Sequence, residues 1–144
     1  MFILAMIIIG LLSYLAGLSS YLYFLKVIYD QSLGSEIAFV IFATLLGFIL
    51  IAYPAFMGIV YAVDQVAKKF KLLLYPLACI AIFFIPTLLI LLIWGGVSPF
   101  SDEALLFYFF YIFSGLVFGI GYWLIQKMNL GRVFKSKTNK KTSL

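Results

Sequence analysis

The sequence has no histidine, a single cysteine and very little charge. Of its 144 residues, 10% are charged and 66% are hydrophobic, whereas soluble domains carry about 25% charged and roughly 45–50% apolar residues. The lack of histidine removes the commonest metal ligand and the commonest general base near neutral pH. Cys79 has no second cysteine with which to form an intrachain disulfide. The composition excludes an ordinary soluble core and indicates that lipid is the solvent for much of the chain.

The motifs of common enzyme classes are also missing. Nothing in the sequence matches a Walker A loop, an H-E-x-x-H motif or a G-x-S-x-G motif. No acid or base lies deep within an apolar run, where ionisable groups usually mark ion or proton pathways. Small four-span drug exporters that are coupled to protons rely on a glutamate in their first helix, and the first apolar run here has none. We therefore expect neither an enzyme nor a bound metal or cofactor.

Four uncharged apolar runs organise the chain, over residues 2–25, 37–63, 72–97 and 104–126. Each exceeds the ~20 residues that a helix needs to cross the hydrocarbon core. Lipid offers no partners to backbone polar groups, so the runs are expected to be helices. The prediction is an all-α integral membrane protein, with one four-helix transmembrane domain over residues 1–127 and a basic tail over 128–144. Because no Lys or Arg precedes Lys26, the first run is expected to be a spanning helix rather than a signal peptide.

The cations are distributed unequally between the two sides of such a four-span chain. Only Lys26 lies on the side of the first and third connections. The other side holds nine: Lys68, Lys69, Lys71, Lys127, Arg132, Lys135, Lys137, Lys140 and Lys141. The positive-inside rule therefore predicts that both termini are cytoplasmic, and the same nine residues are expected to contact anionic lipid. Asp64 lies four residues before Lys68, a spacing that predicts a helical ion pair.

Pairs of small residues four positions apart occur in three of the runs. They are Gly115 and Gly119 in a G-x-x-x-G motif, Ser13 and Gly17, and Ala43 and Gly47. Such pairs let two helices approach closely within a membrane. We interpret them as packing contacts among the four helices of one chain, with self-association through the fourth helix as the alternative.

Prolines and aromatic residues mark further positions in the runs. Pro54 and Pro86 are interior prolines, which act either as static kinks or as hinges beside a cavity. The aromatic residues near the predicted inner boundary are expected to anchor the chain at the level of the lipid headgroups. These residues are Tyr61, Tyr75, Tyr122 and Trp123.

The hydropathy profile of the whole chain resembles that of small four-span membrane proteins of Bacillus-type bacteria. This resemblance implies a location in the plasma membrane and rests on no specific motif. Short loops and small-residue helix faces favour a non-enzymatic accessory protein that binds a partner membrane protein, and nucleic acid is not expected as a partner. Two alternatives stay open: a small dimeric transporter or lipid flippase, and an immunity or stress protein against a peptide or toxin. The last would use the acids of the outer side, Asp30, Glu36, Asp102 and Glu103.

Overall fold

The computed structural model describes residues 2–30, 34–35, 37–67, 69–93, 98 and 101–128, and within these the side chains of 85–93, 102 and 103 are left aside. All regular structure in these residues is helical. The helices are α1 (Phe2–Tyr29), α2 (Ile37–Gly47), the π-helical turn η1 (Phe48–Ala52), α3 (Tyr53–Val66), α4 (Lys71–Ile93) and α5 (Asp102–Lys127). The all-α prediction is therefore confirmed for the described part of the chain.

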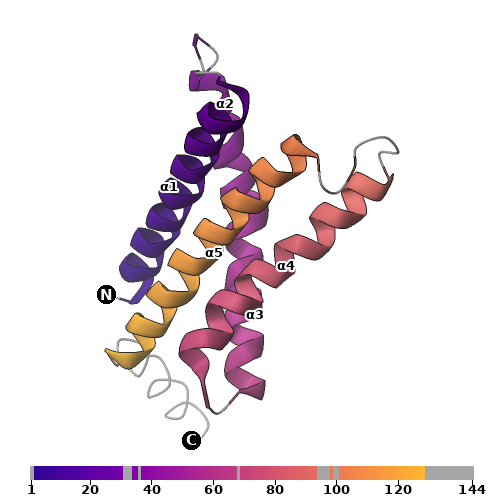
Figure 1. Ribbon diagram of the computed structural model, residues 1–144. Helices are drawn as coiled ribbons and strands as arrows, with labels where there is room; N and C mark the ends of the chain where they lie inside the picture. Colours follow the sequence, from indigo (N-terminus) through magenta and orange to yellow (C-terminus); the bar gives the residue numbers. More distant parts are fainter. Residues whose placement is uncertain are drawn as a thin grey trace, which may run out of the picture.

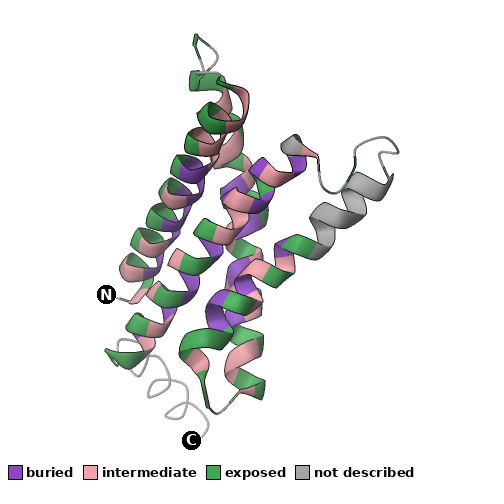
Figure 2. Cartoon of the chain, viewed as in Figure 1, coloured by how far each residue is buried: buried purple, intermediate pink, exposed green. Residues whose placement is uncertain are grey.

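The helices run up and down in turn (Figure 1). The start of α1, the turn between α3 and α4 and the end of α5 all lie at the lower end of the molecule in this view. The closest packing is between α1 and α5 and between α4 and α5, so α5 is the central helix. Figure 2 shows the buried residues facing this central helix, while the outward faces are exposed.

Three of the helical segments are long and apolar enough to cross a membrane: Phe2–Tyr29, Ile37–Val66 and Ala104–Lys127. They correspond to the predicted first, second and fourth runs. In place of the predicted third run, α4 covers Lys71–Ile93, and residues 94–97 lie outside the described part. Within α4 the apolar stretch with described side chains, Lys71–Phe84, is shorter than a full span. Of the predicted tail, only Met128 is described.

Local chemistry explains where two of the helical elements begin. Ser101 accepts a hydrogen bond from the backbone N–H of Ala104 at 3.3 Å and so caps the start of α5. Pro54 follows the π-helical turn, in which the N–H of Tyr53 donates to the carbonyl of Phe48, five residues earlier. A proline has no N–H and its ring crowds the carbonyl four residues before it, so a wider turn relieves both problems.

Aromatic rings fill the centre of the bundle. Phe56 of α3 is fully buried and stacks on Phe118 of α5 with the ring centres 5.0 Å apart. Phe83 of α4 meets the edge of Phe56 at the same separation. These contacts join α3, α4 and α5 through rings whose large buried area and preferred tilted or offset geometry stabilise packing.

Candidate functional site

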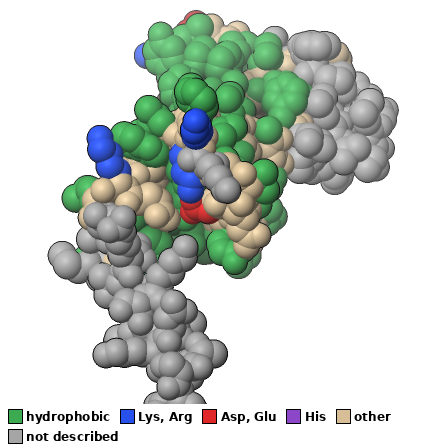
Figure 3. All heavy atoms as spheres, turned by 90° about the horizontal axis from the view of Figure 1, so that it is seen from below, with side chains coloured by type: hydrophobic (Ala, Val, Ile, Leu, Met, Phe, Trp, Pro, Cys, Tyr) green, Lys and Arg blue, Asp and Glu red, His purple; other side chains and the backbone are tan. Residues whose placement is uncertain are grey.

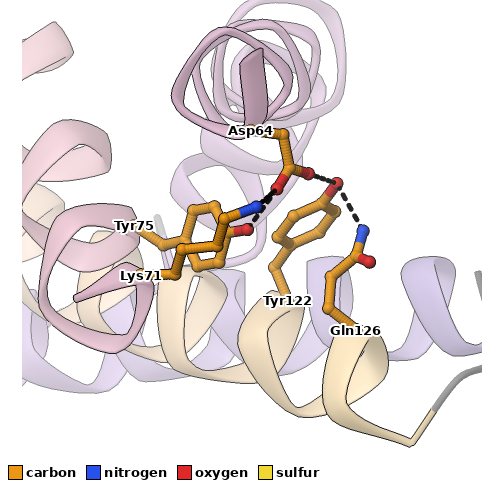
Figure 4. Close-up of polar contacts among 5 residues, drawn as sticks. All are labelled: Asp64, Lys71, Tyr75, Tyr122 and Gln126. Atoms are coloured by element: carbon orange, nitrogen blue, oxygen red, sulfur yellow. Dashed lines mark hydrogen bonds and ion pairs between the residues drawn. The ribbon is translucent and has the colours of Figure 1, made fainter. Parts of the chain in front are cut away.

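A polar cluster joins three helices at the end of the bundle where α3 turns into α4 (Figure 4). Lys71 Nζ lies 2.5 Å from Asp64 Oδ1, and the Tyr75 hydroxyl donates to the same oxygen at 2.5 Å. From α5, the Tyr122 hydroxyl donates to Asp64 Oδ2 at 2.8 Å, and Gln126 Nε2 donates to the Tyr122 oxygen at 2.9 Å. We refer to these five residues as the Asp64 cluster.

The ion pair places each charge at the helix end that suits the opposite charge. Asp64 lies in the last turn of α3, where the backbone dipole favours a cation, and Lys71 is the first residue of α4, where it favours an anion. Each charge alone would be unfavourable at its position. The contact between them offsets both effects, so the pair favours the antiparallel arrangement of α3 and α4.

The turn between the two helices brings the pair together. The extended backbone of Ala67 ends α3, and its N–H donates to the carbonyl of Val63 at 2.8 Å. Phe70 has a φ of 58°, in the left-handed region that residues other than glycine rarely adopt. Its carbonyl accepts from the N–H groups of Leu73 and Leu74, both at 3.1 Å, and thereby starts α4. The chain thus reverses within a few residues and Lys71 faces back towards α3.

The phenols reach Asp64 from the interior, while the ion pair lies nearer the surface. Tyr75 is fully buried and Tyr122 nearly so, whereas the side chains of Lys71 and Asp64 are 33% and 23% exposed. Hydrogen bonds to a charged acceptor are stronger than those between neutral groups. A carboxylate that already accepts three such bonds is poorly placed to take a proton from a substrate. The arrangement suits a structural clamp between helices better than a catalytic base.

No group of three or more His, Cys, Asp or Glu that could hold a metal ion occurs among the described residues. Cys79 is a free, fully buried thiol in α4. It packs in the hydrophobic core together with Tyr75 and Phe118. Its described surroundings suit a small packing residue.

The G-x-x-x-G glycines of α5 face α4. A Cβ added at Gly115 would lie 3.1 Å from the backbone nitrogen of Ile80, and one at Gly119 would lie 2.5 Å from the Cα of Pro76. Close backbone approach therefore depends on both glycines. Both glycines therefore pack against α4 within the chain.

Ser13 and Gly17 lie on the face of α1 that packs against α5. Ser13 is fully buried and its hydroxyl donates to the carbonyl of Ser114 at 2.7 Å. A Cβ added at Gly17 would lie 3.0 Å from the carbonyl oxygen of Phe110. The structure thus uses this pair of small residues for packing within the chain.

Ala43 and Gly47 differ from the other small-residue pairs. Ala43 is exposed, and a Cβ added at Gly47 would meet no atom within 4 Å. The structure therefore does not bring these two into the helix packing that their spacing predicts. The reason is that α2 stands at the edge of the bundle, where none of its eleven residues, all of them described, is buried.

Three of the predicted orientation residues are described: Lys69 in the turn between α3 and α4, Lys71 at the start of α4 and Lys127 at the end of α5. Figure 3 views this end of the bundle and shows basic side chains on it. Lys69 and Lys127 are exposed, and Lys127 Nζ lies 4.9 Å from the centre of the Trp123 ring. Asp64, which the helical spacing pairs with Lys68, pairs with Lys71. The other six orientation residues lie outside the described part: Lys68, Arg132, Lys135, Lys137, Lys140 and Lys141.

The sequence interpretation missed the roles of Tyr75 and Tyr122. Both are expected at headgroup level, and the structure adds that their rings are buried and meet edge to face, with centres 5.0 Å apart. Tyr61, by contrast, is 65% exposed, as a residue at a boundary should be. The one available signal was Asp64 itself, because it is the only acid on the cation-rich side of the predicted topology.

Two apolar cavities separate α2 and η1 from the rest of the bundle. The larger, which we call the aromatic cavity, has a volume of about 230 Å³. Six rings line it, together with aliphatic residues and Thr44: Tyr21, Phe48, Phe83, Phe107, Phe110 and Tyr111. The second cavity, of about 210 Å³, lies between α1 and the α2–η1 segment and has an entirely apolar lining.

The two cavities are separated by side chains through which α1 contacts α2 and η1. Phe48 lines both cavities, and its ring centre lies 5.5 Å from that of Tyr14. The Tyr14 hydroxyl donates to the carbonyl of Ile41 at 3.0 Å and lies 3.0 Å from Thr44 Oγ1. This contact ties α2 to α1 while leaving unfilled space on both sides.

Fold and composition together define the class of this protein. It is a helical chain that includes three segments long and apolar enough to cross a membrane. Comparison with known proteins gave no match to a protein-family model, a curated protein or a solved structure.

Proposed function

We propose that the chain is a four-span protein of the cell membrane with both termini in the cytoplasm, and that it acts as a non-enzymatic accessory protein bound to a partner membrane protein. The three membrane-length helices support the location. In this proposal α4, with 23 residues, supplies the remaining span. The exposed Lys69 and Lys127 lie at the same end as the start of α1, which supports a cytoplasmic placement of that end.

The observation that carries partner binding is the unpacked face of α2. Phe39, Phe42 and Leu46 are 74%, 65% and 47% exposed, and together with the exposed Ala43 they follow the spacing of one helix face. Lipid can cover large apolar side chains of this kind. A small residue at the centre of such a face additionally allows a second helix to approach closely. The proposal assigns this face, Phe39, Phe42, Ala43 and Leu46, to a helix of the partner.

Site-specific photo-cross-linking in cells tests the partner-binding proposal. A photoreactive phenylalanine analogue at Phe42 is expected to give a discrete cross-linked product, and Ala43→Trp in the same chain is expected to abolish it. The matched control places the analogue at Leu4 of α1, which is 63% exposed and apolar. Products that are identical from Phe42 and Leu4, or that persist with Ala43→Trp, would contradict the proposal.

Reporter fusions test the topology separately. Alkaline phosphatase is active only outside the cytoplasm, so a fusion after Leu144 is expected to be inactive and one after Ser98 to be active. Activity after Leu144 would overturn the proposed cytoplasmic position of the C-terminus.

A transporter or lipid flippase is the second candidate, and the aromatic cavity favours it. The cavity is lined by η1, next to Pro54, and π-helical turns often occur at functional sites. The Asp64 cluster joins α3, α4 and α5 at the end of the bundle where α3 turns into α4. Lipid and solute fluxes in reconstituted vesicles test this candidate, and fluxes equal to those of protein-free vesicles would contradict it.

The immunity alternative has no comparable support among the described residues. Of its four acids, Asp30 is exposed, Glu36 lies outside the described part, and the side chains of Asp102 and Glu103 are not described. It stays a prediction from the sequence. A deletion strain with altered sensitivity to cationic peptides would support it.

A further inference from the structure

We propose that the aromatic cavity binds one acyl chain of a membrane phospholipid, which enters from the side between η1 and α5. This inference does not depend on the partner-binding function, because the α2 and η1 residues that line the cavity, Thr44, Gly47 and Phe48, are not among those assigned to the partner. It rests on the size of the cavity, the chemistry of its lining and the exposure of the residues at its rim.

The cavity is large enough to hold a small molecule or part of a larger one. Protein interiors are close-packed and rarely leave voids larger than a water molecule. The aromatic cavity has about 230 Å³, and an apolar cavity of only about 150 Å³ in a protein interior stays dry and takes up benzene. The lining is mostly apolar, whereas a bound water needs two to four polar partners. An apolar molecule is the occupant that the space suits.

The Thr44 hydroxyl of the lining is already hydrogen-bonded within the protein. Thr44 Oγ1 donates to the carbonyl of Val40 at 2.7 Å and contacts the Tyr14 hydroxyl at 3.0 Å. The remaining surface is mostly ring faces and aliphatic groups from α1, η1, α4 and α5. The side chains that line an unfilled cavity lack dispersion contacts on one side, and a flexible hydrocarbon chain would supply them.

The rim of the cavity indicates where the chain comes from. Ile51 of η1 and Phe107 of α5 both line the cavity and are 67% and 49% exposed. The cavity therefore reaches the outer, apolar surface of two helices that are long enough to cross a membrane. Acyl chains of phospholipids are the apolar molecules in greatest supply at such a surface, so one of them is the occupant that the surroundings provide.

Photo-labelling tests the proposal on the full chain reconstituted in vesicles of phosphatidylglycerol and phosphatidylethanolamine. The probe is phosphatidylglycerol with a diazirine in one acyl chain. On the unaltered protein, peptide mapping is expected to find label on cavity residues such as Phe107 and Phe110 in excess of the lipid-facing Ile3 of α1. Label spread evenly over these positions would overturn the proposal.

Two glycine variants sharpen the test. Gly47 lines the cavity and a Cβ there meets open space, so Gly47→Leu is expected to fold, to fill the cavity and to remove most of the label from Phe107 and Phe110. Gly58 of α3 also has open space but does not line the cavity, so Gly58→Leu is the matched control and is expected to keep the label. Full labelling of folded Gly47→Leu would overturn the proposal.

The source of the chain is resolved by a second probe. A free fatty acid with the same diazirine is expected to label the cavity less than the phospholipid does at equal mole fraction in the bilayer. Stronger labelling by the free acid would overturn the assignment to a phospholipid. The labelling map of the unaltered chain does not require any variant. If Gly47→Leu fails to fold, that map alone still tests the proposal.

Discussion

Lys71 Nζ lies 2.5 Å from Asp64 Oδ1, across the turn that joins α3 to α4. Each residue occupies the helix end that its own charge disfavours, so the contact compensates two dipole effects as well as forming an ion pair. Tyr75 and Tyr122 add hydrogen bonds to the same carboxylate from α4 and α5. The carboxylate therefore joins three helices, and its removal should weaken the packing of all three.

We expect Asp64→Ala to lower the free energy of unfolding in mild detergent by about 1–3 kcal/mol, because it leaves the buried Tyr75 hydroxyl and the Lys71 charge without their acceptor. Asp64→Asn, which keeps an acceptor but loses the charge, should have a smaller effect. Thermal unfolding followed by circular dichroism measures both. Gln65→Ala, at the exposed neighbouring position, is the control and should leave stability unchanged. A wild-type unfolding curve for Asp64→Ala would show that the cluster does not stabilise the fold.

Gly119→Ala tests the close approach of α5 to α4. The added methyl group would lie 2.5 Å from the Cα of Pro76, a backbone atom that cannot move aside by rotating a side chain. We expect a loss of about 1–3 kcal/mol in stability from this overpacking. Gly58→Ala places the same methyl group in open space on α3, where alanine favours the helix by up to about 1 kcal/mol. Equal melting temperatures for the two variants would contradict the predicted contact.

The sequence predicts where the helices lie along the chain better than it predicts which face of each helix points inward. The three helical segments of membrane length follow from long uncharged runs that are visible in the sequence, and the start of α5 at Ser101 follows a local hydrogen-bonding rule. The inward face of each helix cannot be predicted from the sequence, because apolar residues surround the helix on all sides and no amphipathic pattern separates core from lipid. This is why Gly115 and Ala43 have the same spacing motif but opposite environments.

The Asp64 cluster could not be predicted from the sequence for a different reason. The spacing rule for a continuous helix favours Lys68 as the partner of Asp64, but α3 ends at Val66. Lys71 reaches Asp64 only because the backbone reverses through Phe70, a residue without the usual sequence signal for a positive φ. Tyr75 gave no signal either, since an amphipathic ring suits a membrane boundary as well as a buried hydrogen bond.

Ser13→Ala is expected to weaken the contact between α1 and α5. The Ser13 hydroxyl donates to the Ser114 carbonyl at 2.7 Å from a fully buried position, and hydrogen bonds between membrane helices contribute about 0.6 kcal/mol on average and at most about 1.7 kcal/mol. A drop of that size in unfolding free energy is expected. Ser19→Ala removes a hydroxyl from an exposed position of the same helix and should have no effect. If both variants lose equal stability, the cause lies in α1 alone and not in its contact with α5.

Tyr108→Phe and Tyr122→Phe remove the same atom from α5 with opposite expected results. The Tyr108 hydroxyl is buried and has no hydrogen-bond partner among the described residues. Removing a buried polar group that lacks a partner should leave stability unchanged or raise it by up to about 1 kcal/mol.

The Tyr122 hydroxyl instead donates to Asp64 and accepts from Gln126, so Tyr122→Phe should lower stability by about 1–3 kcal/mol. Guanidinium or thermal unfolding of the two variants side by side in one detergent provides the comparison. Because the two changes share chemistry, helix and size, a difference between them reports on hydrogen bonding alone. A larger loss for Tyr108→Phe than for Tyr122→Phe would mean that the Tyr108 hydroxyl has a partner in the intact membrane protein and that the Asp64 cluster contributes less than its geometry indicates.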